Sequence, residues 1–138
     1  MNSGRVSDAA QISSIVCVMI KATALTVVLA AVAMPVLADP VSDGQAVFVQ
    51  CKACHASQAG KTSFGPNLFG VAGRKAGSLP GYAYSDAMKS AGFKWTDANL
   101  DAFLTDPKAK VPGNAMPFAG VSDPTKRTAL IAYLKTLK

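Results

Sequence analysis

The 138-residue sequence has only one His, one Trp and three Cys, and no long block of like charges. The missing charge block argues against a nucleic-acid-binding tail. The sequence also lacks internal repeats, low-complexity segments and any useful stretch of alternating apolar and polar residues, so it indicates neither a repeat architecture nor β structure. Half of the residues are hydrophobic and 16% are charged, which excludes an intrinsically disordered chain. The length allows one domain at most.

The hydrophobic residues are concentrated near the N-terminus, whereas all ten aromatic residues lie beyond position 47. From Met19 the chain has a short basic start with Lys21, then a long apolar run, then a site of small residues that ends at Ala38. This layout is typical of a secretory signal peptide cut after Ala38. We therefore predict that residues 1–38 form the leader and that residues 39–138 form the mature domain. Within the leader segment, we expect translation to start at Met19 and not at Met1.

The alternative for this leader is a retained membrane anchor, because its apolar run approaches the ~20 residues that a spanning helix needs. Only Asp39 to Ser42 would then separate the anchor from the first expected helix. Such a tether is too short for a domain that must reach a partner, so cleavage is the favoured interpretation.

The mature domain shows helix signals separated by two loops rich in Gly and Pro. We expect helices over about 42–54 and 85–92, from Thr96 to before Pro107, and from Pro124 onward. Six Gly and two Pro lie within residues 60–81, and three Pro and two Gly within residues 107–121. Loops of this length in a compact domain are usually functional. The predicted fold class is all-α, with four to five short helices.

Three side chains close together in sequence carry recognisable chemistry. Cys51, Cys54 and His55 form the pattern C-x-x-C-H, the attachment sequence for covalent haem. On a helix, residues i, i+3 and i+4 share a face, so both thiols and the imidazole point the same way. The thiols can add to the two vinyl groups of one porphyrin while the imidazole reaches the iron. The motif predicts one haem c, bound through Cys51 and Cys54, with His55 as an iron ligand.

Other interpretations of the same motif fit the chain less well. A structural zinc site needs four ligands, and two Cys and one His in the mature domain would require an added Asp. A thioredoxin-like redox pair belongs in a βαβ context that this chain lacks. A disulfide remains as an alternative for an exported chain, but two Cys on one helical turn point poorly for it. It also leaves His55 unexplained.

The second axial position of the iron needs another donor, and the mature domain has no second His. Met88 and Met116 are the two methionines that survive signal cleavage. Met88 lies in an expected short helix, where methionine commonly fills a core. Met116 lies in a loop stiffened by proline on both sides. We predict Met116 as the ligand, and His/Met ligation raises the reduction potential of the iron.

Beyond this motif, the chain resembles class I monohaem cytochrome c of the soluble bacterial and mitochondrial type, over residues 42–138. The resemblance rests on separated motifs in matching order: Gly44-x-x-x-Phe48, Gly65-Pro66-Asn67-Leu68, Gly73-Arg74-Lys75, Gly81-Tyr82-Ala83-Tyr84, Trp95, Pro112-Gly113, Phe118-Ala119-Gly120 and Leu130-Ile131-Ala132-Tyr133-Leu134-Lys135. It implies the cytochrome c fold, in which the helices and long loops wrap one covalent haem.

The resemblance also implies roles for residues around this haem. The carbonyl of Pro66 would accept a hydrogen bond from the ring nitrogen of His55 that does not face the iron, which orients the ring. Tyr84 and Trp95 would donate to a buried haem propionate. Arg74 would lie nearby and offset its charge.

Near the Met116 loop the sequence departs from the mitochondrial pattern. Phe118 would cover the haem edge, as the family implies. Asn114 stands where a threonine usually faces a propionate, and we include it among the cofactor-binding residues. Phe103 replaces a tyrosine that often donates to the methionine sulfur, and Phe69 replaces a histidine. These changes should alter the reduction potential and the strength of the iron–methionine bond, and they leave the family resemblance intact.

By this resemblance, we expect the protein to be a non-enzymatic single-electron carrier in a bacterial periplasm and a monomer. Its partners would be redox complexes with acidic docking surfaces: a quinol-oxidising complex, a terminal oxidase, a photosynthetic reaction centre or a reductase. The mature domain has 12 Lys and Arg against 7 Asp, a formal charge of +5, which suits such partners. The lysines expected around the haem edge are Lys52, Lys61, Lys75, Lys108 and Lys110.

Two other functions remain open at this stage. The chain could be the electron-accepting subunit of a periplasmic dehydrogenase, in which case it would copurify with a larger chain. It could instead be a haem peroxidase or gas-binding protein in which Met116 does not bind the iron. The second function lacks support in the sequence, because no second His and no Arg-His pair able to split a peroxide is present.

Overall fold

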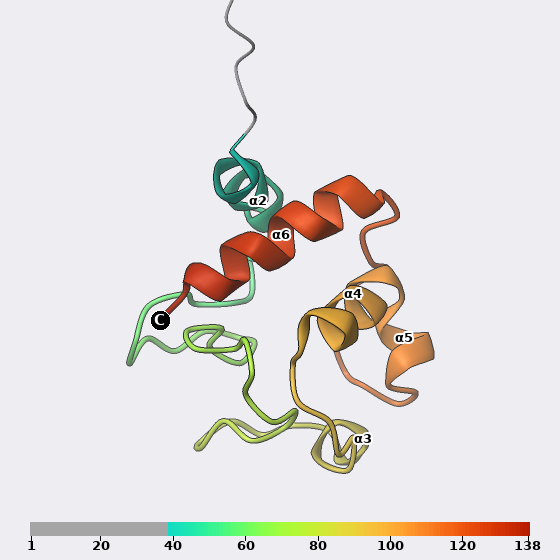
Figure 1. Cartoon of the computed structure of the whole chain (residues 1–138). Coiled ribbons are helices and arrows are strands. Elements are labelled where there is room, and N and C mark those ends of the chain that lie inside the picture. The colour runs from blue at the N-terminus through green and yellow to red at the C-terminus, as the bar shows by residue number, and fades with distance from the viewer. Residues whose placement is uncertain (1–38) are drawn as a thin grey trace, which may run out of the picture. The chain divides into compact units, whose positions relative to one another are not determined.

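The computed structural model describes residues 39–138. The predicted signal peptide and the predicted start at Met19 lie outside these residues. The helices are α2 (Pro40–Phe48), α3 (Asp86–Lys89), α4 (Asp97–Thr105), α5 (Pro107–Lys110) and α6 (Pro124–Thr136) (Figure 1). In this part of the chain the only β pairing is one isolated bridge between Lys75 and Lys94, so the all-α prediction is confirmed. None of these helices has the length and apolar character needed to cross a bilayer.

The helix starts follow from capping side chains. Ser85 caps α3 and Thr96 caps α4, each accepting a hydrogen bond from a backbone N–H of the first turn. Asp123 caps α6, and Pro124 occupies its first position, where the missing N–H costs nothing. The predicted starts of these three helices are confirmed.

The first helix differs from the prediction at both ends. It begins at Pro40 because Asp39 caps it, and its carboxylate accepts from the N–H of Val41 at 3.0 Å. It ends at Phe48, and a series of turns replaces the predicted helix as far as Cys54. In the last of these turns the N–H of His55 donates to the carbonyl of Cys51 at 2.9 Å. The attachment motif therefore lies on one helix-like turn after α2.

The second loop also differs, because the chain forms α5 where an irregular segment was expected. Asp106 caps this helix, and its carboxylate accepts from the N–H groups of Lys108 and Ala109, each at 3.0 Å. Pro107 ends α4 and also takes the first position of α5. Asp106 next to this proline is the signal that could have predicted the extra turn.

The core forms where α2 crosses α6, with α4 packed against α6 from another side (Figure 1). Phe48 and Leu130 have no exposed surface, and the rings of Phe48 and Tyr133 lie 5.0 Å apart. Gly44 makes the close crossing possible. A Cβ at this position would overlap the backbone carbonyl of Ala129 and lie 2.8 Å from Cβ of Tyr133.

Backbone hydrogen bonds fasten the long loops to this helical frame. Gly73 donates to the carbonyl of Trp95, and Trp95 donates back to that of Arg74, both at 2.9 Å. In the second loop, Val121 donates to the carbonyl of Leu104 at 2.7 Å. The loops thus have fixed positions relative to α4, although they contain little regular structure.

Candidate functional site

His55 is oriented by the first long loop. Its Nδ1 lies 2.8 Å from the carbonyl oxygen of Pro66. Because a carbonyl oxygen can only accept, Nδ1 must carry the proton, and Nε2 then keeps its lone pair. This is the tautomer that a metal-binding imidazole needs. The hydrogen bond expected from the sequence is therefore present, and it leaves a nitrogen ready to bind iron.

The two motif cysteines lie in different surroundings. Cys51 is half-buried and packs against the hydrophobic core, whereas Cys54 is exposed. Burial raises the pKa of the Cys51 thiol to about 11. The attachment motif therefore lies at the boundary between core and surface. Two thiols and one imidazole with a free lone pair are the donor set that a covalent haem requires, so the residues present fit this group.

Gly65 packs directly against the imidazole, a role that the sequence did not reveal. A Cβ on Gly65 would lie 2.6 Å from Cε1 and 2.8 Å from Nδ1 of His55. Its N–H donates to the carbonyl of Cys54 at 2.7 Å. Gly65 thus ties the loop to the motif and leaves no room beside the ring for a larger residue. The pairing of Gly with Pro66 in one short motif was the signal that could have pointed to this contact.

Asn67 closes the loop on itself, which was also not predicted. Its amide nitrogen donates to the carbonyls of Gln58 and Lys61, both at 2.6 Å, and its oxygen accepts from the N–H of Phe69 at 2.7 Å. All of these bonds join one side chain to backbone groups of the same loop. Asn67 therefore sets the path of the chain on both sides of Pro66.

Arg74 lies under the same loop. Its guanidinium donates to the carbonyl of Asn67 at 2.9 Å and to that of Phe69 at 3.0 Å. Burial lowers the pKa of Arg74, and the nearby Tyr84 opposes this effect. Burial likewise raises the pKa of Tyr84, against the opposing Arg74 charge and a hydrogen bond to the backbone of Leu79. Arg74 and Tyr84 therefore lie near enough to influence each other's pKa. Their contact with a haem propionate stays a prediction.

Trp95 is buried within an aromatic cluster. Its ring lies 4.9 Å from the ring of Phe93 and 4.9 Å from that of Phe103, both in edge-on arrangements. Lys110 places its ammonium 4.9 Å from the centre of the Phe93 ring and donates to Asn99 at 2.9 Å. Lys110 is therefore held by its neighbours, unlike the exposed lysines of the first loop.

Met116 and Met88 differ in their surroundings. Met88 is 8% exposed and belongs to the core cluster, whereas Met116 is half-buried at the edge of that cluster. Phe118, also half-buried, follows Met116, and its N–H donates to the carbonyl of Met116 at 3.0 Å. Met116 is thus the methionine on a loop at the margin of the core.

Asn114 fixes the Met116 loop through the backbone. Its amide nitrogen donates to the carbonyls of Pro107 at 2.7 Å and Val111 at 2.9 Å, while its oxygen accepts from the N–H of Met116 at 3.0 Å. Both amide hydrogens therefore already have backbone partners. Asn114 thus shapes the loop that carries Met116. Its expected place among the cofactor-binding residues, facing a propionate, stays a prediction.

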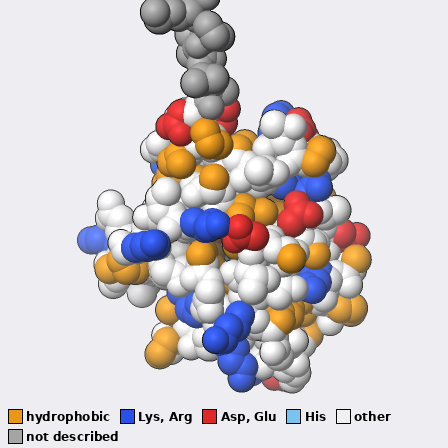
Figure 2. Space-filling model, viewed as in Figure 1, with side chains coloured by type: hydrophobic (Ala, Val, Ile, Leu, Met, Phe, Trp, Pro, Cys, Tyr) orange, Lys and Arg blue, Asp and Glu red, His pale blue; other side chains and the backbone are white. Residues whose placement is uncertain are grey.

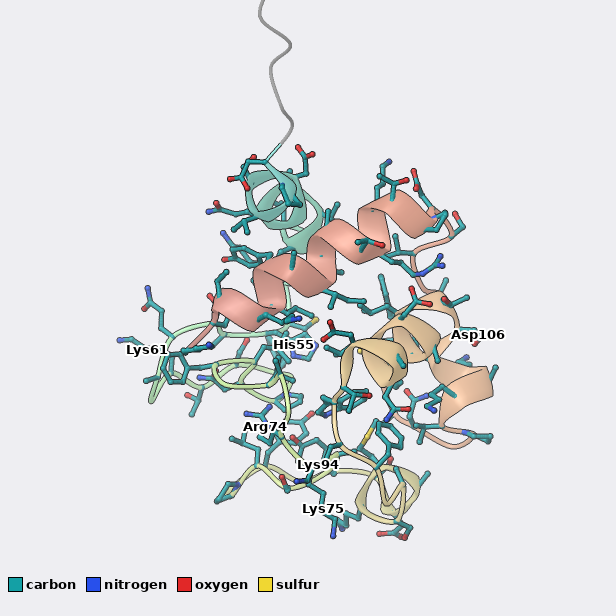
Figure 3. The ribbon with its side chains drawn as sticks, viewed as in Figure 1. His55, Lys61, Arg74, Lys75, Lys94 and Asp106 are labelled. Carbon is teal, nitrogen blue, oxygen red and sulfur yellow. The ribbon has the colours of Figure 1, made fainter. Side chains whose placement is uncertain are left out.

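The site residues come from separate parts of the chain. Figure 3 shows His55 beneath α6, with Arg74 below it and Lys61 on the loop that extends to the left. Asp106 lies on the opposite side, beyond α4. No group of three or more His, Cys or Asp that could hold a free metal ion occurs within residues 39–138.

Comparison with known proteins defines the class. The chain matches the cytochrome c family over residues 41–138. It is 48% identical over 97 residues to cytochrome c2 iso-2 of Magnetospirillum molischianum, covering 70% of this chain and all of that protein. It is 47% identical over 109 residues to cytochrome c2 of Blastochloris viridis, covering 78% and 86% of the two chains.

A solved structure gives the same result. Cytochrome cH from Methylobacterium extorquens superimposes with a TM-score of 0.66 at 50% identity, covering 70% of this chain and 97% of that one. The protein belongs to the cytochrome c family and has its all-α fold. It is a class I monohaem cytochrome c, and Cys51 and Cys54 occupy the positions through which the family binds haem c covalently.

Proposed function

We propose that this cytochrome is a single-electron carrier of a bacterial periplasm that shuttles between respiratory or photosynthetic redox complexes. His55 and Met116 would be the axial ligands. Haem c supplies the one-electron chemistry when bound. The observation that best supports the proposal is that both residues are fixed by their loops. The His55 ring donates to the carbonyl of Pro66 and packs against Gly65, and the backbone N–H of Met116 donates to Asn114. Ligands that stay in place when the iron changes charge suit electron transfer.

The remaining proposed residues have matching roles. Tyr84 and Trp95, with Arg74 nearby, would bind the propionate side, and Phe118 would shield the edge beside Met116. A tyrosine phenol is protonated at neutral pH, and burial raises the pKa of Tyr84 further, so its hydroxyl can donate a hydrogen bond. The exposed Cys54 marks where the attachment site reaches the surface. Electrons would enter and leave near this residue.

We propose that this role is non-enzymatic, and the same side chains support it. His55, the single His of the sequence, already donates a hydrogen bond to the carbonyl of Pro66 through one ring nitrogen and would bind iron through the other. No second imidazole remains for acid–base chemistry. We expect the reduced protein to leave carbon monoxide unbound and the oxidised protein to lack peroxidase turnover above free haem. Rapid binding of carbon monoxide would instead favour a gas-binding protein or peroxidase.

Exposed lysines would guide the carrier to acidic partners. Lys52, Lys61, Lys75 and Lys108 are exposed, whereas Lys110 is held by Asn99 and Phe93. Charges at the rim of a contact chiefly raise the association rate and are screened by salt. We expect electron transfer to a purified cytochrome c oxidase to slow as ionic strength rises. A rate independent of salt would remove this part of the proposal.

Export and leader cleavage also belong to the proposal. Asp39, the residue after the predicted cut, caps α2, so cleavage behind Ala38 would leave this helix complete. N-terminal sequencing of protein purified from the periplasmic fraction should begin at Asp39. A longer N-terminus recovered with the membrane fraction would instead support the retained anchor.

A further inference from the structure

Phe64 is an aromatic side chain that packs against almost nothing. It is 90% exposed, and the other large hydrophobic side chain exposed within residues 39–138 is Val49, at 63%. Every other phenylalanine in this part of the chain is buried or half-buried. Holding an apolar ring in water brings no stability to the folded chain. Phe64 therefore differs from the packing residues that make up the rest of the aromatic set.

The backbone around Phe64 is nevertheless well held. The hydroxyl of Tyr82 donates to the carbonyl of Phe64 at 3.2 Å. The N–H of the next residue, Gly65, donates to the carbonyl of Cys54. Asn67 donates to the carbonyls of Gln58 and Lys61, which precede Phe64 in the same loop. The ring thus projects from a fixed loop. An anchor that is already in position costs little ordering entropy when it binds.

Phe64 also lies next to the redox site. Its neighbour Gly65 packs against the ring of His55, and the N–H of Gly65 bonds to the carbonyl of the exposed Cys54. A protein seated on Phe64 would therefore lie close to the point where the attachment motif reaches the surface. This position suits a contact through which electrons pass.

The charge around this loop has one sign. Between Asp43 and Asp86 the sequence holds four basic residues and no acidic one. Figure 2 shows Lys and Arg but no Asp or Glu over the projecting loop at the left, where Figure 3 places Lys61. A second copy of this chain would bring the same positive surface, so self-association here is opposed by charge. The complementary occupant carries negative charge.

We propose that Phe64 is the apolar anchor of the docking surface, inserting into an apolar pocket ringed by carboxylates on the redox partner. The proposal rests on the carrier function stated above. Aromatic side chains that become buried at the centre of a contact carry much of its binding energy, while rim charges act mainly on the association rate. Phe64 would thus determine affinity and Lys61 the rate of encounter.

The test compares four variants of the haem-loaded protein with the wild type: Phe64→Ser, Phe64→Leu, Val49→Ser and Lys61→Ala. Two probes are used, a purified cytochrome c oxidase and a purified quinol:cytochrome c oxidoreductase, each at low and high ionic strength. Ferricyanide, a small anionic oxidant, reports the intrinsic redox competence of each variant. Because Phe64 is exposed, its substitution should leave the unfolding midpoint unchanged.

We expect Phe64→Ser to raise KM by about tenfold with at least one complex, at both ionic strengths, with kcat and the ferricyanide rate unchanged. Phe64→Leu should recover most of the affinity, and Val49→Ser should match the wild type. Lys61→Ala should raise KM only at low ionic strength. A KM for Phe64→Ser within twofold of the wild type for both complexes overturns the anchor while the carrier function stands.

Two further outcomes also overturn the anchor. If the wild type exchanges electrons with neither complex, the proposed respiratory shuttle fails and the anchor fails with it. If sedimentation shows a dimer of the wild type that Phe64→Ser dissociates, the occupant is a second copy of the chain.

Discussion

The helical frame and the long loops of this protein are held together by different forces. Where α2 crosses α6, apolar side chains such as Phe48 and Leu130 are removed from water completely. In the loops, by contrast, Asn67, Arg74 and Asn114 each bond to two or three backbone groups. The frame therefore supplies stability, and the loops supply the positions of His55 and Met116. Changes in the two regions should have separable effects.

Gly44→Ala should give the largest loss of stability and leave the redox properties nearly intact. The added methyl group meets the backbone of Ala129, which cannot rotate away. Overpacking of this kind costs about 3 kcal/mol, offset by ~1 kcal/mol of better helix propensity. Chemical denaturation should show a net loss of about 2 kcal/mol in the free energy of unfolding.

Gln45→Ala, at an exposed position on the same helix, is the matched control and should unfold as the wild type does. If the shift in reduction potential of Gly44→Ala, expressed as a free energy, equals its loss in the free energy of unfolding, the two regions are coupled more tightly than proposed.

Gly65→Ala should mainly change the redox site and cost less stability than Gly44→Ala, because the new methyl group meets the imidazole of His55. We expect an altered spectrum of the ferric haem and a shifted potential, with a loss of stability of about 1 kcal/mol. Gly60→Ala serves as a control for removing a loop glycine, since a Cβ there meets nothing, although its positive φ carries a strain of its own. An unchanged spectrum in Gly65→Ala would show that the ring is not held by this contact.

Asn114→Ala should loosen the Met116 loop by removing three hydrogen bonds at once. These groups are half-buried, so water can replace part of what is lost, and we expect about 1 kcal/mol in stability. Added imidazole should displace Met116 about tenfold more readily, measured by the change in the visible spectrum. If Asn114 instead served only a propionate, Asn114→Thr would restore the wild-type affinity for imidazole. If Asn114 shapes the loop, Asn114→Thr cannot restore this affinity, because a hydroxyl has one hydrogen to donate and the amide of Asn114 donates two hydrogen bonds.

A small pH effect should come from Tyr84. Burial raises its pKa in the folded protein, so the folded state keeps the proton while the unfolded state releases it near pH ~10. Stability should therefore fall as pH rises above about 10. Tyr84→Phe cannot ionise, so its stability relative to the wild type should improve between about pH 9 and 11. Parallel pH profiles for the two proteins would rule out this contribution.

The sequence predicted the frame better than the loops for a physical reason. Caps such as Ser85, Thr96 and Asp123 act over three or four residues, so α3, α4 and α6 could be located from local sequence. The start of α2 was placed at residue 42, because Ser42 and Asp43 also resemble a cap and an acidic first turn, whereas Asp39 is the cap. The whole of α5 was missed, because Pro107 was interpreted as an end to regular structure.

The site divides in the same way. Cys51, Cys54 and His55 were found because their spacing is local, and family resemblance indicated Pro66. The contacts of Gly65, Asn67 and Asn114 depend on how irregular loops fold back, and no periodicity in the sequence encodes such paths. Several roles stay predictions that spectroscopy can test: iron ligation by His55 and Met116, haem contacts by Arg74, Tyr84, Trp95 and Asn114, and cover of the haem edge by Phe118.

The most direct test of the account is the visible spectrum of the oxidised protein, in the far-red region where methionine sulfur bound to ferric haem gives a weak band. We predict that the band is present, vanishes in Met116→Ala and survives in Met88→Ala, whose effect should be limited to core packing. The potential of Met116→Ala should fall by on the order of 0.1 V. A band that survives in Met116→Ala, or is absent from the wild type, would contradict the His55 and Met116 pair on which the carrier function rests.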